Sequence, residues 1–161
     1  MSTADYFLKI DGIEGESEDD KHKGEIEILS FSFGASNAGS MSYGGGGGTG
    51  KVAMQDFNFT KRHDKASPKL FLHCCNGKHI AKAVFVARKQ GGEALEYLKI
   101  TLSDILVTSI SDSGSEGSGD MMEQIAFNFA KIESEYTPQT AQGRGGGKVP
   151  FNWDVKANKG G

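Results

Sequence analysis

Apolar and polar side chains alternate along most of the chain, and this alternation predicts a protein built mainly from β-strands. Turn signals rich in glycine, serine and asparagine separate the alternating segments at short intervals. The pattern is typical of an all-β barrel or sandwich, here with a single helical insert. The predicted strands cover residues 6–10, 25–33, 51–60, 80–88, 93–102, 105–111, 122–136 and 149–155.

The predicted strand over residues 25–33 changes its apolar face partway along. Ile26 and Ile28 lie on one face, whereas Leu29 and Phe31 lie on the other. A β-bulge, or a strand that passes from one neighbouring strand to another, explains such a change. The next predicted strand shows the same change of face. A strand with apolar residues on both faces is often covered twice, by its own core and by another subunit.

One helix is predicted after the third strand. Ser67 is a suitable N-cap, Pro68 suits the first helical position, and Gly77 follows as a stop signal. Two pairs of residues four apart give this helix a narrow apolar stripe, Leu70 with Cys74 and Phe71 with Cys75. The two cysteines are adjacent, which does not suit a disulfide framework, so we expect reduced, buried thiols.

Composition favours one domain over residues 1–161. The chain has 161 residues, 24% of them charged, and a formal net charge of -3. This length is enough to bury a core without disulfide or metal support. The charge balance gives no electrostatic basis for binding nucleic acid. No apolar run approaches the roughly 20 residues of a membrane helix, and residues 1–10 do not form a signal peptide. We therefore expect no membrane insertion, and residence in the cytoplasm after synthesis.

Candidate catalytic and metal-binding residues do not form recognisable sites in the sequence. On a helix, His73, Cys74 and Cys75 point in three directions, and no Cys-x-x-Cys or His-x-x-x-His pair is present. His63 and Asp64 follow Lys61 and Arg62 in the chain. Neighbouring residues along a chain do not face each other, so solvated charge is the default interpretation for these four residues. We expect no enzyme activity, no cofactor and no metal site.

A glycine-rich segment nearly matches a phosphate-binding P-loop. In the pattern G-x-x-x-x-G-K-[ST], Gly45, Gly50 and Lys51 fit, but Val52 stands where a Mg²⁺-binding hydroxyl is required. A P-loop also follows a buried strand and opens a helix, whereas the residues after Lys51 read as extended chain. A nucleotide-binding protein using residues 45–51 is the alternative prediction. The simpler one is a long, glycine-rich loop over residues 37–50 between two strands.

Several short stretches together resemble one known family. They are Phe7-Leu8-Lys9-Ile10, Gly15-Glu16-Ser17, Ile26-Glu27-Ile28-Leu29-Ser30-Phe31-Ser32-Phe33-Gly34, the loop over residues 44–51, Gln55-Asp56-Phe57-Asn58-Phe59-Thr60-Lys61, Asp64-Lys65-Ala66-Ser67-Pro68-Lys69-Leu70, Lys89-Gln90-Gly91-Gly92, Glu96-Tyr97-Leu98-Lys99-Ile100-Thr101-Leu102 and Asn128-Phe129-Ala130. They run from end to end in family order. The sequence resembles the haemolysin-coregulated protein family, the inner-tube proteins of bacterial type VI secretion systems.

The resemblance implies a structural protein. The family fold is a β-barrel, here of about eight strands, with one flanking α-helix. Six subunits form a ring with a wide channel, and rings stack into a tube inside a contractile sheath, tipped by a spike trimer. The channel carries small effector proteins. Contraction expels the tube, so the protein assembles in the cytoplasm and reaches the extracellular space or a target cell without a signal peptide. A ring-forming, chaperone-like adaptor is a close alternative.

The resemblance also implies two sets of functional residues. Ser30 and Ser32 form the small polar face of the second predicted strand and are candidates for lining the channel, where they would contact effectors. Ordinary solvent exposure on a barrel surface explains these serines equally well. The family's extended loop reaches the neighbouring subunit or ring, and its candidate contact residues here are Tyr43, Gly44, Gly45, Gly46, Gly47 and Gly48.

Deletion of residues 43–48 should weaken assembly while the subunit still folds, because no predicted core strand is removed. Native mass spectrometry would measure the ring mass and electron microscopy the stacking of rings. Circular dichroism would confirm that the shortened subunit keeps its β-structure. An unchanged ring mass together with unchanged stacking would refute a role of this loop in assembly.

Overall fold

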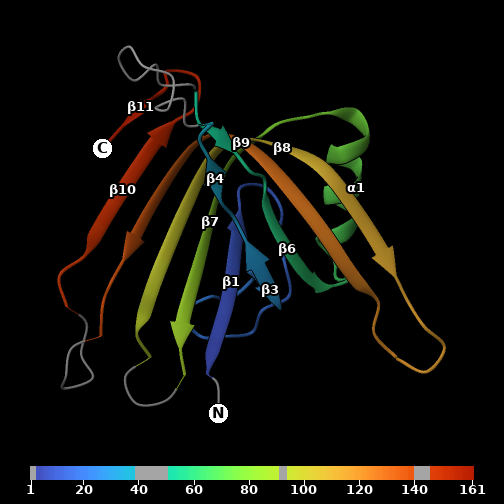
Figure 1. The fold of residues 1–161 in the computed structure, drawn as a ribbon. Coiled ribbons are helices and arrows are strands. Elements are labelled where there is room, and N and C mark those ends of the chain that lie inside the picture. The colour runs from blue at the N-terminus through green and yellow to red at the C-terminus, as the bar shows by residue number, and fades with distance from the viewer. Residues whose placement is uncertain (1–2, 39–50, 91–93, 140–145) are drawn as a thin grey trace.

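A computed structural model describes residues 3–38, 51–90, 94–139 and 146–161. In this part of the chain, eleven strands and one helix are present (Figure 1). The strands are β1 (Ala4–Ile10), β2 (Ile26–Ile28), β3 (Ser30–Ser32), β4 (Ala35–Ser36), β5 (Ala53–Met54), β6 (Phe57–Arg62), β7 (Ile80–Lys89), β8 (Glu96–Ser113), β9 (Met122–Tyr136), β10 (Val149–Asp154) and β11 (Lys159–Gly160). The helix is α1 (Ser67–Asn76), whose ten residues are too few to cross a bilayer.

Nine of these strands form one antiparallel sheet that curls around the core. Its order is β11-β10-β9-β8-β7-β1-β2, and β6 pairs with both β3 and β9. β9 is long enough to serve two neighbours on one side, β6 along its first half and β10 along its second. The sheet does not close through a continuous ladder, because β2 pairs with β1 whereas β3 pairs with β6. The predicted β-rich fold with one flanking helix is confirmed.

The predicted change of face at Leu29 marks the point where the strand changes partner. Leu29 lies between β2 and β3 and donates its backbone N–H to the carbonyl of Thr60 in β6 (2.8 Å). Before Leu29, Ile26 and Ile28 are buried in β2, which pairs with β1. After Leu29 the alternation is reversed, and Phe31 packs against the core. The strand therefore passes from one neighbour to another, as the pattern indicated.

Aromatic rings occupy the centre of the core. The Phe85 ring centroid lies 4.5 Å from that of Phe31 and 5.4 Å from that of Phe57, and Tyr6 meets Phe31 edge to face. Such offset and edge-to-face contacts add to the free energy gained from burying the rings. Other fully or nearly buried apolar side chains are Leu8, Ile26, Phe59, Leu70, Ile100, Leu102, Ile105, Phe127 and Ile132.

Some strand boundaries differ from the prediction. The two strands predicted over residues 93–102 and 105–111 are one strand, β8, in which Asp104 has φ 53°. A single residue in the left-handed region bends the strand without ending it, and sequence periodicity does not reveal this. The strand predicted over residues 51–60 is divided into β5 and β6. The predicted turn at Gly91 and Gly92 lies outside the described residues.

Helix α1 begins and packs differently from the prediction. Its N-cap is Ala66, and Ser67 is the first helical residue, with its hydroxyl directed into a buried polar network instead of capping the helix. The end is as predicted, with Gly77 at φ 69° in a left-handed C-cap. Leu70 is buried, but Phe71 and Cys75 are exposed and Cys74 is only half-buried against the core, so the expectation of two buried thiols is wrong.

Ion pairs hold the acidic segment over residues 14–23 against the sheet. Arg88 of β7 donates to both carboxylate oxygens of Asp19 (2.9 and 2.8 Å) and to Asp5 of β1 (3.0 Å). Bidentate pairing of a guanidinium with a carboxylate is stronger than a single ionic contact. The hydrogen bond from Arg88 lowers the pKa of Asp19 from 3.8 to about 2.

His22 makes a second attachment of the same segment. Its ring stacks on Phe7 of β1, with centroids 4.3 Å apart. Nδ1 contacts Glu25 (3.0 Å) and Nε2 contacts Glu96 (2.7 Å). Since ionised carboxylates only accept hydrogen bonds, the ring bonds both partners only when both of its nitrogens carry protons. The segment is therefore part of the folded structure.

Replacing Asp19 with Asn should reduce stability at neutral pH and remove part of its acid dependence. The folded pKa of Asp19 is depressed, so its contribution is present above pH 3.8 and is lost as the pH falls toward about 2. For a partly exposed pair we expect a loss on the order of 1 kcal/mol at pH 7. Urea denaturation between neutral pH and pH 2 would measure it, with Asp20→Asn as the exposed neighbouring control. An equal stability difference across this whole pH range would contradict the assignment.

Candidate functional site: an uncharged polar face on four strands

The outer surface of β3, β6, β9 and the second half of β8 carries small, uncharged polar side chains. We call this surface the polar face. It consists of two rows of directly opposite residues. One row is Ser30, Thr60, Gln124 and Ser111, and the other is Ser32, Asn58 and Ser109, with the buried Ala126 between Asn58 and Ser109. A shallow depression lies over it. The four strands thus present one continuous surface that no single strand contains.

Strand alternation places these residues outward. In β6, Phe57 and Phe59 are buried in the core, so Asn58 and Thr60 point to the other side. β9 alternates in the same way, so Ile125 is buried whereas Gln124 and Asn128 are exposed. Across the first row, the hydroxyls of Ser30 and Thr60 are 2.6 Å apart and hydrogen-bonded.

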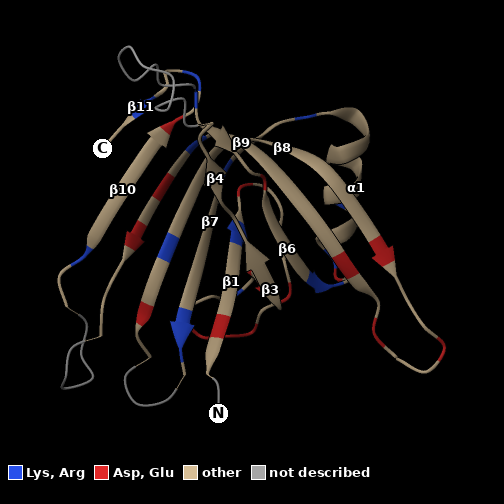
Figure 2. Ribbon diagram, viewed as in Figure 1, with Lys and Arg blue, Asp and Glu red and all other residues tan. Residues whose placement is uncertain are grey.

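Charged residues appear only at the two ends of the polar face. At one end, Arg62 contacts Asp120 (3.4 Å). At the other, Asp56 accepts hydrogen bonds from the Thr108 hydroxyl (2.6 Å) and the Asn128 amide (3.1 Å). Between these ends the described residues of the face carry no charge. In Figure 2, β3 and the body of β6 are tan, and blue begins where β6 ends.

The first half of β8 and the second half of β9 carry charged residues on their outer surface. An uncharged outer surface is therefore not a requirement of β-structure. There the outward residues include Lys99 opposite Glu135 and Ser103 opposite Lys131. Lys131 also contacts Glu133 within β9 (3.2 Å). Opposite charges facing each other across strands are a common source of sheet stability. The polar face is therefore a local property of the first half of β9 and its neighbours.

The two serines predicted to line a channel lie at one edge of the polar face. Ser30 and Ser32 are both exposed on β3, with Thr60 and Asn58 as their partners on β6. The sequence alone did not identify the partners, because pairing between segments far apart in the chain depends on register. The predicted contact residues Tyr43 to Gly48 lie outside the described residues.

An apolar groove lies between the β4–β5 ribbon and β10. Its lining residues are Phe33, Gly34, Ala35, Val52, Met54, Ile132, Phe151 and Trp153. Phe33 and Phe151 remain 38% and 42% exposed, which is unusual for phenylalanine. The indole N–H of Trp153 is buried and has no acceptor among the described residues. The groove is therefore an apolar surface that the described residues leave uncovered.

The P-loop alternative lacks its structural setting. After Lys51 the chain continues into β5 and β6, whereas a P-loop must open a helix. Residues 45–50 lie outside the described part of the chain. The described residues that follow them therefore match the simpler prediction of a connection between strands.

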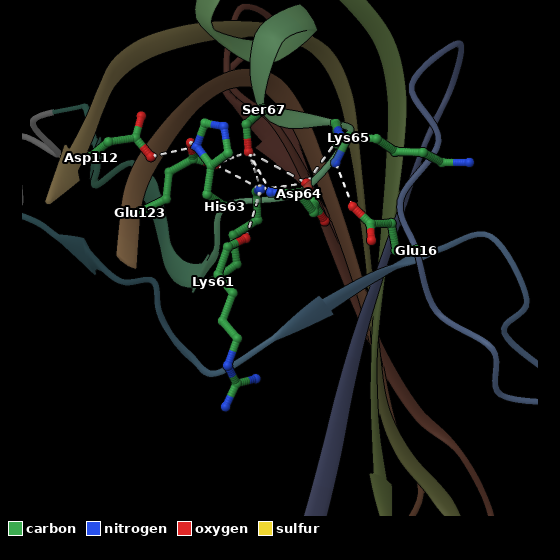
Figure 3. A network of polar contacts seen from close by, with 10 residues as sticks. Glu16, Lys61, His63, Asp64, Lys65, Ser67, Asp112 and Glu123 are labelled. Carbon is green, nitrogen blue, oxygen red and sulfur yellow. Dashed lines mark hydrogen bonds and ion pairs between the residues drawn. The ribbon is translucent and has the colours of Figure 1, made fainter. Parts of the chain in front are cut away.

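A buried network of charged residues lies at the base of helix α1 (Figure 3). Lys61 and Glu123 have fully buried side chains and are 2.7 Å apart. Lys61 also donates to Asp64 (2.7 Å) and to the Ser67 hydroxyl (2.9 Å). The sequence interpretation of solvated charge here is wrong for Lys61. Like Phe57 and Phe59, Lys61 lies on the inward-facing side of β6, so its side chain enters the core.

His63 and Asp112 extend the network toward the surface. His63 Nδ1 is 3.0 Å from Asp112 and 3.5 Å from Glu123. Burial raises the pKa of Glu123, and the nearby Asp112 carboxyl raises it further, against the effect of Lys61. Burial also acts to raise the pKa of Asp112, but the neighbouring Glu123 carboxyl and the His63 imidazole lower it overall. The network thus holds two carboxylates close together in a mostly enclosed position.

Comparison with known proteins finds consistent relatives. A family model described as "Type VI secretion system effector, Hcp" matches residues 7–136. Protein hcp1 of Pseudomonas aeruginosa is 49% identical over 156 residues, 96% of each chain. The crystal structure of Hcp1 from Salmonella typhimurium is 42% identical, with a TM-score of 0.82 and 99% of both chains covered. A structure described as a type six secretion system protein is 34% identical, with a TM-score of 0.93 over 99% of this chain and 100% of the other.

Proposed function

Because the chain belongs to the Hcp family of type VI secretion proteins, we propose that it is the structural subunit of the secretion tube. Six copies form a ring around a channel, and rings stack into a tube enclosed by the sheath and tipped by the spike. The channel carries small effector proteins, and contraction of the sheath exports tube and cargo together. This role requires no catalytic residues.

The polar face is the observation that carries this proposal. A channel wall must hold different cargo proteins and then release them. Hydroxyl and amide groups make exchangeable hydrogen bonds with many surfaces, whereas fixed charges would favour cargo of one sign and repel the other. We place Ser30, Ser32 and their row partners on the channel side for this reason. The charged halves of β8 and β9 then lie away from the cargo.

The apolar groove supports self-association. Interface cores between subunits are apolar and rich in aromatic residues, as this groove is. A neighbouring copy that fills it would bury Phe33 and Phe151. A ring requires a head-to-tail contact, in which the groove of one subunit receives a different surface of the next.

Replacing Ser32 with Glu should reduce effector retention while rings still form. The new carboxylate introduces a bulky charge into the uncharged wall but leaves the buried faces of β3 unchanged. Co-purification of effector proteins with the rings, quantified by mass spectrometry, would measure retention, and we expect a loss of tenfold or so at an interface of this kind.

Two variants control this experiment. Ser32→Thr keeps a hydroxyl and should retain cargo, and Ser103→Glu places the same charge in the other half of β8, between Lys82 of β7 and Lys131 of β9. Wild-type retention in Ser32→Glu, or equal losses in Ser32→Glu and Ser103→Glu, would count against the channel assignment.

Replacing Phe151 with Asp should prevent ring formation without unfolding the subunit, because the side chain is 42% exposed before assembly. A charge buried without a partner at an interface disfavours association strongly. Negative-stain microscopy and light scattering would report rings or monomers. The control is Phe71→Asp on α1, where the ring is 47% exposed and outside the groove.

The possible outcomes distinguish failure of the groove as a subunit contact from failure of the proposed tube function. Rings in wild type and Phe71→Asp but monomers in Phe151→Asp would support both. Rings in Phe151→Asp would exclude the groove as the subunit contact. Monodisperse monomers of the wild-type protein would contradict the tube role itself, and rings that never stack would favour a ring-forming adaptor.

A further inference from the structure

Three possible metal ligands converge where β6, β8 and β9 meet beside helix α1. His63 follows β6 directly, and Asp112 in β8 is the cross-strand partner of Glu123 in β9. One ligand atom from each side chain lies within 4.8 Å of the other two. The backbone N–H of His63 donates to the carbonyl of Met121 (2.9 Å), which holds the backbone of His63 beside the start of β9.

Glu123 brings a buried oxygen without a hydrogen-bond partner into this cluster. Its side chain is fully buried, and its Oε1 accepts hydrogen bonds from Lys61 and the Ser67 hydroxyl (2.7 and 3.0 Å). Its Oε2 accepts no hydrogen bond from the described residues and is directed toward His63 Nδ1, 3.5 Å away. A buried carboxylate oxygen without a hydrogen-bond partner destabilises the folded state unless a proton or a cation occupies the adjacent space.

The net charge of the cluster also favours a bound cation. Asp64, Asp112 and Glu123 are three acids, and Lys61 is the enclosed base among them. Arg62 is exposed and contacts Asp120 outside the cluster. With neutral histidine, the described groups around the site carry an excess of negative charge. Like charges directly opposite across two strands, as for Asp112 and Glu123, destabilise a sheet unless they are compensated.

We propose that His63, Asp112 and Glu123 bind one divalent transition-metal ion, with zinc as the reference ion. Zinc bonds to histidine nitrogen and carboxylate oxygen are about 2.0–2.2 Å long, so ligand atoms sharing an ion lie roughly 3–3.6 Å apart. The distances from His63 Nδ1 to Asp112 (3.0 Å) and Glu123 (3.5 Å) fall in this range. One imidazole with two carboxylates suits zinc or manganese better than magnesium or calcium.

The surroundings of the site already resemble those of a metal centre. Lys61 and Ser67 hold the far oxygen of Glu123 and so orient the oxygen that would bind the ion, as supporting residues do in known metal sites. The positive charge of Lys61 is balanced by Asp64, 2.7 Å away. His63 is 39% exposed, so the ion can enter from solvent and retain water on its open side. Figure 3 shows Asp112, Glu123 and His63 together at one end of the network.

A bound ion would fasten the ends of three strands. β8 and β9 meet at this point, before the connection over residues 114–121, and β6 leads from here into helix α1. An ion bound only by the folded state stabilises it in proportion to the logarithm of its concentration. The role is structural and separate from the polar face, so it does not depend on the proposed tube function.

The test titrates the full-length protein, freed of metal by chelation, with zinc in a calorimeter. We expect one ion per chain and a thermal midpoint that rises with zinc concentration. Cobalt serves as a spectroscopic probe, and its visible bands should appear without the charge-transfer band of a thiolate ligand, which excludes Cys74 and Cys75. No saturable binding at millimolar zinc would overturn the proposal.

Variants identify the ligands. His63→Ala and Asp112→Asn should each weaken zinc binding about tenfold or more, whereas Glu123 is left intact because Lys61 depends on it. The control is His79→Ala, which removes a histidine 2.6 Å from Asp104 with no third ligand among the described residues. Unchanged affinity in both ligand variants, or an equal loss in His79→Ala, would overturn the assignment. Circular dichroism confirms that each variant is folded.

Discussion

The buried ion pair between Lys61 and Glu123 is the constraint on which the arrangement of the sheet depends. Transferring either charge out of water costs several kcal/mol, and that cost is offset only while the partners stay in place. The two residues are directly opposite each other in the β6–β9 ladder, and Asp64 and Ser67 complete the bonds of the ammonium group. The pair therefore fixes the register of β6 on β9 and attaches the start of helix α1 to both strands.

That register also determines what the outer surface presents. A slip of one residue would turn every side chain of β6 to the opposite face, exposing Phe57 and Phe59 and moving Lys61 out of reach of its partner. It would also separate Thr60 from Gln124 and Ser30, which form one row of the polar face. The buried charges and the exposed polar rows are thus two sides of the same strand pairing. The surface that supports the proposed function is positioned from inside the core.

Sequence reasoning predicted the features that are local in the chain. Alternation located most strands, the face change at Leu29 marked the switch of partner, and Gly77 marked the end of α1. It failed where the answer depends on residues far apart. Lys61 looks solvated because lysine is rarely buried, and only Glu123, distant in sequence, makes its burial tolerable. The rows of the polar face and the cluster around His63 depend likewise on register, which no single segment encodes.

Residues 123 and 124 of β9 have different roles, one in the core and one on the outer surface. Glu123 faces inward and belongs to the buried network, whereas Gln124 faces outward in the polar face. Exposed substitutions on a sheet usually change stability by only about 0.5 kcal/mol, so folding tolerates charge at Gln124, Asn58 or Ser32. The second half of β9 uses that freedom and carries Lys131 and Glu133. Since stability does not account for the absence of charge across four strands, contact with other molecules is the better explanation. Contact with varied cargo in the proposed channel would favour such an uncharged surface.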